Sequence, residues 1–256
     1  MQESEEFITL SAFANMMHGQ VHPVIISRES EDEYYSHHGV GTAFVLEYAG
    51  EIFVVTAQHV LNAQNATHDD LRILLRNAPI SVIFDQRAVF RDEHDPDPDS
   101  DLAIFRVVRS QHAALFQAGL TTLDAENCVE DADMDAVDTF HIFGYPDVGR
   151  GYDYEEKSLE GDLRCLSGQL VDPALPGLMS IKIQGERPEK FRGMSGSVVI
   201  ADIDDIWKFA GMVTLASDPK GILSFIPAEK IAFYLNKMVL MEMTGMLLPE
   251  QPSNPP

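Results

Sequence analysis

The chain has 256 residues, with 18 Lys and Arg against 41 Asp and Glu, which gives a formal net charge of −23. A surface this acidic repels phosphate groups, so we do not expect the protein to bind nucleic acid or an anionic membrane. Hydrophobic residues make up 45 %, close to the globular average, so we expect a folded chain, either two small domains or one all-β unit.

The cysteines and the N-terminal residues restrict the chemistry and the compartment. Cys128 and Cys165 lie far apart and lack the spacing of a disulfide framework or a zinc site. The first residues are acidic where a secretory signal is basic, and no stretch approaches the ~18 apolar residues of a membrane span. We therefore expect a cytoplasmic protein that uses no metal and no cofactor.

The first half of the chain is predicted to be rich in short strands. After a short helix at 7–17, apolar stretches predict strands at 21–26, 41–48, 51–56, 71–75, 80–84, 88–91 and 102–108. Ala49 and Gly50 separate the second strand from the third, which is typical of a hairpin turn because glycine adopts positive φ easily.

A second series of strands follows a connector at about 110–138, which is interpreted as solvated because its residues 124–138 carry only acidic charges. These strands are predicted at 139–146, 163–170, 178–183, 197–201, 209–215 and 222–226. The residues Ile231, Tyr234, Leu235 and Met238 then follow the spacing of a helix docked on a core. The Pro-rich end at 249–256 is expected to be disordered.

Three short segments carry the residue types of nucleophilic acyl transfer. They are Thr-Ala-Gln-His-Val (56–60) after one strand, Asp-Ser-Asp-Leu-Ala-Ile (99–104) before another, and Gly-Met-Ser-Gly-Ser (193–197) before a third. A serine hydroxyl is a weak nucleophile unless a base takes its proton and a carboxylate orients that base. The segments therefore predict an active site built from His59, one of Asp99 and Asp101, and Ser195.

With these motifs the sequence resembles the trypsin-like serine peptidases of the chymotrypsin fold, in particular their bacterial branches. Further matches are Gly-Val-Gly-Thr-Ala-Phe (39–44), His-Ile-Phe-Gly-Tyr-Pro (141–146), Ala-Gly-Met-Val-Thr (210–214) and Ser-Phe-Ile-Pro-Ala (224–228). The resemblance covers residues 21–240. Three motifs in this order, each beside a strand, are a more specific signal than any one of them.

The resemblance implies an all-β fold of two six-stranded antiparallel β-barrels followed by a C-terminal helix. The implied parts are an N-terminal extension at 1–20, a first barrel at 21–115, an acidic linker at 116–138, a second barrel at 139–228, a helix at 229–248 and a tail at 249–256. The active site would lie in the cleft between the barrels, with His59 and Asp101 from the first and Ser195 from the second.

The resemblance also implies a role for each of these residues. His59 would be the general base and then the general acid, Asp101 would orient it, and Ser195 would attack the substrate carbonyl. The backbone amides of Gly193 and Ser195 would form the oxyanion hole, on a bend that Gly193 and Gly196 permit. The implied function is that of a serine endopeptidase, which cleaves specific intracellular protein or peptide substrates through an acyl-enzyme.

Substrate recognition is implied at two further places. Thr214, Leu215 and Ala216 would line the substrate backbone, and Glu189 lies on the segment that forms the base of the primary specificity pocket. A glutamate there favours a basic residue at the cleavage site, whereas a glutamate on a loop is more often simply solvated.

Met194 departs from the digestive enzymes of this family, which hold an Asp there that pairs with a new N-terminus after activation cleavage. That switch is absent, so the loop is either preformed or ordered by something else, such as a regulatory protein partner. Three alternatives stay open. Asp99 is the rival of Asp101, a protein-binding module with little catalysis is the rival of the enzyme, and an esterase would use the same triad.

Overall fold

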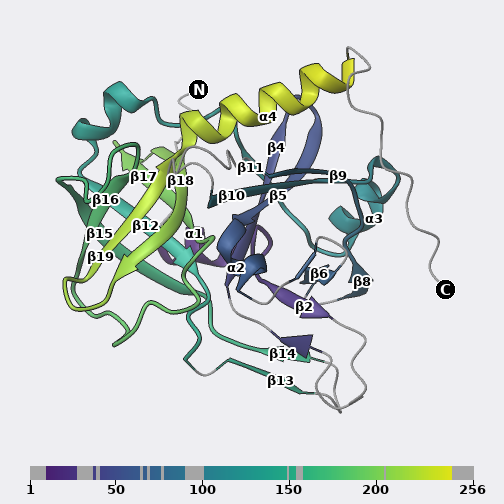
Figure 1. Cartoon of the computed structure of the whole chain (residues 1–256), viewed down its shortest axis with the longest axis horizontal. Helices are drawn as coiled ribbons and strands as arrows, with labels where there is room; N and C mark the ends of the chain where they lie inside the picture. The colour runs from purple at the N-terminus through teal and green to yellow at the C-terminus, as the bar shows by residue number, and fades with distance from the viewer. Residues whose placement is uncertain are drawn as a thin grey trace, which may run out of the picture.

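The structure is a computed structural model of the chain, and strands dominate it (Figure 1). It describes residues 10–27, 37–38, 41–63, 66–67, 70–75, 78–89, 101–148, 150–153, 158–204 and 206–243. Figure 1 shows two groups of strands, one from each half of the chain, with the C-terminal helix α4 lying across both.

The second half of the chain forms a closed six-stranded antiparallel barrel. In spatial order its strands are β12 (Thr139–Gly144), β15 (Arg164–Val171), β16 (Met179–Gln184), β19 (Ile222–Pro227), β18 (Ile206–Ser217) and β17 (Val198–Ile203). Each of the six strands predicted after the acidic connector overlaps one of these, so this part of the prediction is confirmed. A separate two-stranded sheet pairs β13 (Gly151–Asp153) with β14 (Ser158–Glu160).

The strands of the barrel that face the first half bury both of their faces. Along β17, Val199 and Ala201 lie in the barrel interior, while Val198 and Ile200 belong to the core that the two halves share. Successive side chains of a strand point to opposite faces, so burial on both faces requires a continuous apolar run. The sequence Val-Val-Ile-Ala (198–201) provides that run.

The first half forms an open sheet. Its strands are β1 (Val21–Pro23), β4 (Thr42–Tyr48), β5 (Glu51–Ala57), β10 (Leu102–Val107) and β9 (Phe84–Val89), and β11 (Leu123–Asp124) pairs with β4. Two smaller sheets join β3 (His37–His38), β2 (Ile25–Ser27) and β6 (Leu71–Arg72), and β7 (Leu74–Leu75) with β8 (Ala78–Ser81). No sheet of the first half closes within the described residues, so the expected first barrel is not shown.

Two local predictions for the first half have different outcomes. The hairpin between β4 and β5 is present, with Ala49 at φ 50° and Gly50 at φ 76°, the positive values of a type I′ turn. The single strand predicted at 21–26 is instead two strands, because the chain passes from one sheet to another at Val24, whose amide donates to the carbonyl of Gly41 at 3.0 Å.

The acidic connector is packed onto both halves, in addition to being solvated. It contains η4 (Arg109–Gln111), α3 (His112–Gln117), β11 and η5 (Asp131–Ala136). Leu115 and Ala125 are buried in the shared core, and Met134 is buried in the barrel interior. The carboxylates of Asp131 and Asp133 are exposed, as their charge requires. The connector therefore fixes its position with its apolar residues and exposes its charges.

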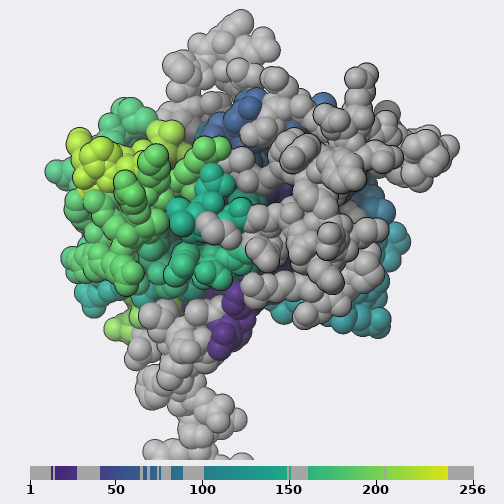
Figure 2. Space-filling model, turned by 90° about the horizontal axis from the view of Figure 1, so that it is seen from below, coloured from purple at the N-terminus to yellow at the C-terminus, as the bar shows by residue number. Residues whose placement is uncertain are grey.

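Helix α1 (Leu10–Met17) lies within the helix predicted at 7–17; the residues before Leu10 are outside the described part. Phe13 stacks on Trp207 of β18 with ring centroids 4.2 Å apart and meets the ring of Phe143 edge-on at 5.7 Å. Figure 2 shows purple N-terminal residues at the surface between the green second half and the blue and teal first half. The start of the described chain thus contributes to the core that the two halves share.

Helix α4 (Ala228–Met243) corresponds to the predicted C-terminal helix. Its residues Ile231, Leu235 and Met238 are buried in the shared core, which confirms the predicted apolar stripe. The predicted end of this helix and the tail at 249–256 lie outside the described residues. No helix in the described part of the chain is long and apolar enough to cross a membrane.

The buried His22 on β1 is expected to make the free energy of unfolding depend on pH. Burial lowers its pKa from 6.5 to about 4. Because the folded pKa lies below the unfolded one, the unfolded chain binds more protons in this window, and stability falls as the pH drops from 6.5 towards 4, by up to about 3 kcal/mol. We expect urea unfolding at several pH values to show a smaller acid loss in His22→Gln than in the wild type. Equal losses in both proteins would contradict this.

Candidate active site

The register of two strands brings His59 and Asp101 together. Leu102, the first residue of β10, pairs with Ala57, the last residue of β5. The residue before β10 therefore lies beside the short helix α2 (Gln58–Asn62), which begins directly after β5. Two residues that are 42 positions apart in the sequence are neighbours for this reason.

The Asp101 carboxylate makes two hydrogen bonds to His59. Its Oδ2 lies 2.7 Å from the ring Nδ1, and its Oδ1 accepts from the backbone amide at 2.8 Å. A carboxylate that accepts at Nδ1 selects the neutral tautomer with its proton on Nδ1, the tautomer whose lone pair is on Nε2. The His59 side chain is 44 % exposed and that of Asp101 20 %, so the ring is accessible to a substrate while its partner is shielded. The rival Asp99 lies outside the described residues.

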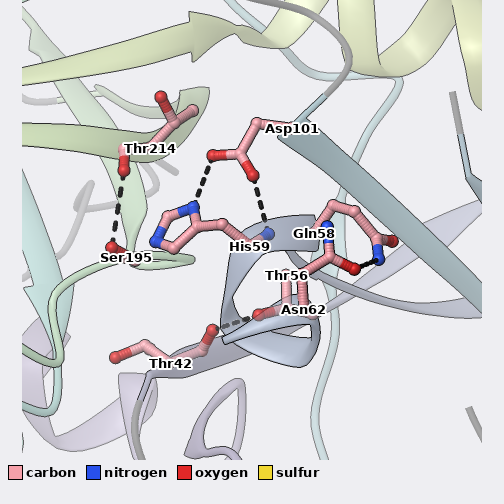
Figure 3. Close-up of polar contacts among 8 residues, drawn as sticks. All are labelled: Thr42, Thr56, Gln58, His59, Asn62, Asp101, Ser195 and Thr214. Carbon is pink, nitrogen blue, oxygen red and sulfur yellow. Dashed lines mark hydrogen bonds and ion pairs between the residues drawn. The ribbon is translucent and has the colours of Figure 1, made fainter. Parts of the chain in front are cut away.

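Ser195 lies on the loop that leads into β17, and this loop is attached to the first half of the chain. The amide of Thr42 donates to the carbonyl of Ser195 at 2.8 Å, and Thr42 is next to Ala43, which pairs with Thr56 on β5. In Figure 3 the ring of His59 lies between the carboxylate of Asp101 and the hydroxyl of Ser195. That hydroxyl donates a long hydrogen bond, 3.4 Å, to the carbonyl of Thr214. The structure thus gathers the three predicted residues in one place.

Residues 191–197 form the serine loop, and the carbonyls of its residues 192–195 are all held by hydrogen bonds. Their donors, in order, are Asp147 N, Thr42 Oγ1, Ser197 N and Thr42 N, at distances of 2.8, 2.9, 3.0 and 2.8 Å. Each peptide unit of the loop is therefore fixed in its orientation. These donors come from both halves of the chain.

The amides of the same loop fall into two kinds. Met194 N donates to Phe191 O at 2.9 Å, and Gly196 N donates to Val213 O at 2.8 Å. The amides of Gly193 and Ser195 donate no hydrogen bond within the described part of the chain. A trans peptide directs its N–H opposite to its carbonyl, so these two amides point away from the partners of the preceding carbonyls. Two unused donors beside a serine hydroxyl can stabilise a developing oxyanion.

Backbone geometry explains the two glycines of this loop. Gly193 has φ 92° and Gly196 has φ 83°, values that favour glycine. A Cβ on Gly193 would lie 2.6 Å from the carbonyl oxygen of Tyr145, and one on Gly196 would overlap the carbonyl of Thr42. Both positions are therefore closed to any side chain.

Met194 anchors the loop by apolar packing. Its side chain is fully buried in the barrel interior together with Phe191, and its sulfur accepts from the hydroxyl of Ser197 at 3.9 Å. Here the loop has its bent form within the single chain.

Of the three residues predicted to line the substrate backbone, Thr214 lies next to Ser195, whose hydroxyl donates to its carbonyl, and the other two follow it along β18. The pairing of β18 with β17 ends at Met212, whereas Leu215 and Ala216 pair with β19 on the other side. Leu215 is 44 % exposed, and Thr214 is buried. Among the described strands none pairs with the second edge of residues 214–216. That edge can accept an extended chain.

Glu189 is exposed on the loop between β16 and β17, and it has no polar partner among the described residues. The carboxylate that organises this region is Asp218, which sequence reasoning missed. Its Oδ1 accepts from the amide of Phe191 at 2.8 Å, and its carbonyl accepts from the guanidinium of Arg187 at 2.8 Å. Asp218 therefore joins the β18–β19 turn to the loop that carries Glu189, and no motif in the sequence identifies it.

The segment after β12 contains further residues that the sequence analysis did not assign. Asp147 forms an ion pair with Arg192 at 3.0 Å, in addition to the backbone bond to the same residue. The guanidinium of Arg150 donates to Gly41 O at 2.9 Å and to Val24 O at 2.7 Å, and burial lowers its pKa to about 10. The sequence match at 141–146 ends directly before Asp147. It is the signal in the sequence that points to this segment.

Metal binding and similarity to known proteins add no further assignment. No three His, Cys, Asp or Glu side chains in the described part of the chain are grouped so as to hold a metal ion. No protein-family model matches the chain, and no curated protein sequence matches it. What the site does is therefore inferred from its own geometry.

Proposed function

We propose that the protein is a serine endopeptidase of the trypsin-like type, with His59, Asp101 and Ser195 as its triad and a fold that corresponds to two β-barrels. The observation that carries the proposal is the combination of an oriented imidazole with a neighbouring serine loop that presents two unused amides. General bases and oxyanion donors are each common, but their convergence on one serine is specific to acyl transfer.

Peptide hydrolysis would proceed in two steps, acylation of Ser195 and hydrolysis of the acyl-enzyme. His59 Nε2 takes the proton of Ser195 Oγ as this oxygen attacks the substrate carbonyl, and the amides of Gly193 and Ser195 bind the oxyanion. The imidazolium keeps its Nδ1 proton on the ring, where it donates to Asp101, and gives its Nε2 proton to the leaving amine as the C–N bond breaks. A water molecule repeats the sequence on the acyl-enzyme, which releases the acid and restores the serine.

The free protein represents a state before this reaction. The Ser195 hydroxyl donates to Thr214 O, so it has to turn towards Nε2 for proton transfer. Catalytic hydrogen bonds are often loose without substrate and tighten in the complex. A substrate strand beside residues 214–216 would compete for the edge on which the Thr214 carbonyl lies, which favours that turn.

The open edge of β18 favours peptides over small esters as substrates. An extended peptide can add to a strand edge through main-chain hydrogen bonds, and exposed side chains such as Leu215 then contact it. The preference for basic residues that was inferred from Glu189 gains no support from contacts of its side chain, so it stays a prediction.

A fluorophosphonate probe tests the proposal. We expect the probe to label the wild type on Ser195, to leave Ser195→Ala unlabelled, and to label Ser180→Ala normally, since Ser180 is buried in the barrel and bonded to Ser224. Labelling should be accompanied by cleavage of a random peptide library. A folded wild type without labelling would favour the binding module, and ester hydrolysis without peptide cleavage would favour the esterase.

A further inference from the structure

The side chain of Thr42 lies at a meeting point of three segments. It is fully buried at the start of β4, and its hydroxyl donates to the carbonyl of Gly193 at 2.9 Å. The same hydroxyl accepts from the amide of Tyr145, directly after β12, at 2.9 Å. One side chain of the first half thus joins the serine loop to the end of a barrel strand.

We infer that Thr42 is a positioning residue, whose hydroxyl holds Gly193 from both sides so that its amide faces the reacting carbonyl. It bonds the Gly193 carbonyl directly, and it anchors Tyr145 at the start of the segment 145–147. The amide of Asp147 in that segment holds the carbonyl of Arg192, which belongs to the same peptide as the Gly193 N–H. The inference rests on the proposed function. It assigns to a threonine of the first half the task that an ion pair at position 194 has in the digestive relatives.

The need for such a hold follows from the glycine itself. Gly193 has no side chain, and its φ of 92° is one of several conformations open to glycine, so local sterics do not fix the peptide. The hydroxyl of Thr42 supplies one donated and one accepted hydrogen bond, which satisfies two main-chain groups at once. Without it, the buried carbonyl of Gly193 lacks its donor and the amide of Tyr145 lacks its acceptor. A shift of the serine loop and of residues 145–147 towards other partners then becomes favourable, and it would move the Gly193 amide.

The side chain of Thr42 can be tested apart from its backbone. The amide of Thr42 donates to Ser195 O, and its carbonyl accepts from Thr56 Oγ1 at 2.7 Å. Thr42→Val keeps both of these bonds and the shape of the side chain, and it removes only the hydroxyl. Thr42→Ser keeps the hydroxyl and removes a methyl group.

The experiment compares kcat and KM of the full chain for a peptide that the wild type cleaves. We expect Thr42→Val to lower kcat by roughly 10²-fold, the size of the loss of one oxyanion donor, with KM nearly unchanged because residues 214–216 are untouched. Thr42→Ser should retain a kcat close to the wild type, as should the control Ser180→Ala. If Thr42→Val does not fold, Thr42→Ala is measured in its place.

The outcomes separate this inference from the proposed function. A wild-type kcat in Thr42→Val, or a loss in Thr42→Ser as large as in Thr42→Val, would overturn the role of the hydroxyl while the peptidase stands. If the wild type does not react with a fluorophosphonate, the proposed function fails, and crystal structures decide the role of Thr42 on their own. A Gly193 amide turned away from Ser195 in Thr42→Val would support the role, and an unchanged amide would overturn it.

Discussion

Replacement of Asp101 by Asn is expected to lower kcat/KM of peptide hydrolysis by about 10⁴-fold while the protein stays folded. The carboxylate accepts two hydrogen bonds from His59, one from the backbone amide and one from Nδ1. An amide side chain has one accepting oxygen, so its NH₂ group must face one of these two donors. If it faces the ring, Nδ1 becomes an acceptor and the proton moves to Nε2, where it blocks the base.

Asp85→Asn is the matched control for this experiment. Asp85 lies on the neighbouring strand β9 and forms a two-point ion pair with Arg106, and its side chain is 21 % exposed, nearly the same as Asp101. The control should lose stability, because the guanidinium of Arg106 is buried, but it should retain activity. Peptide hydrolysis by Asp101→Asn within about tenfold of the wild type would contradict the assigned role.

Gly196→Ala is the second substitution with a large expected effect. Its Cβ would overlap the carbonyl of Thr42 and lie 2.7 Å from the hydroxyl of Thr56, at a φ of 83° that alanine adopts only with strain. The serine loop would have to move off β4, which breaks the bond between Thr42 and Ser195. We expect fluorophosphonate labelling to slow by at least 10²-fold, together with a lower melting temperature.

Gly50→Ala is the control for Gly196→Ala. It separates the effect of a positive φ from that of steric overlap with Thr42. Gly50 has a similar φ, 76°, in the β4–β5 turn, and a Cβ there would meet no atom within 4 Å. This variant should lose about 1 kcal/mol of stability and keep the labelling rate of the wild type. Wild-type labelling by Gly196→Ala would show that the loop does not depend on its close approach to Thr42.

The second half of the fold could be predicted well because its strands are apolar runs bounded by turns. β17 is the clearest case, since both of its faces are buried and no polar residue interrupts residues 198–201. The first half was harder, because a run such as 21–26 does not reveal that the chain changes sheets at Val24. The acidic connector was interpreted as solvated because its charges obscure the few apolar residues that anchor it, Met134 among them.

The three candidate triad residues could be singled out from sequence because each stands in a short motif beside a predicted strand. The residues that shape the site were missed for the opposite reason. Thr42 acts through main-chain partners more than 100 positions away, and a threonine in a strand is an ordinary residue. Asp147 and Arg150 likewise act on backbone groups, which every residue has and no motif can specify. Only the fold brings such partners together.

The core shared by the two halves limits how the molecule can move. It contains Phe13 of α1, Phe44 of β4, Phe143 of β12 and Leu235 of α4 in one continuous cluster. A hinge that separated the halves would expose these side chains to water, at a cost that grows with the apolar area. The spacing between His59 and Ser195 is therefore set when the chain folds.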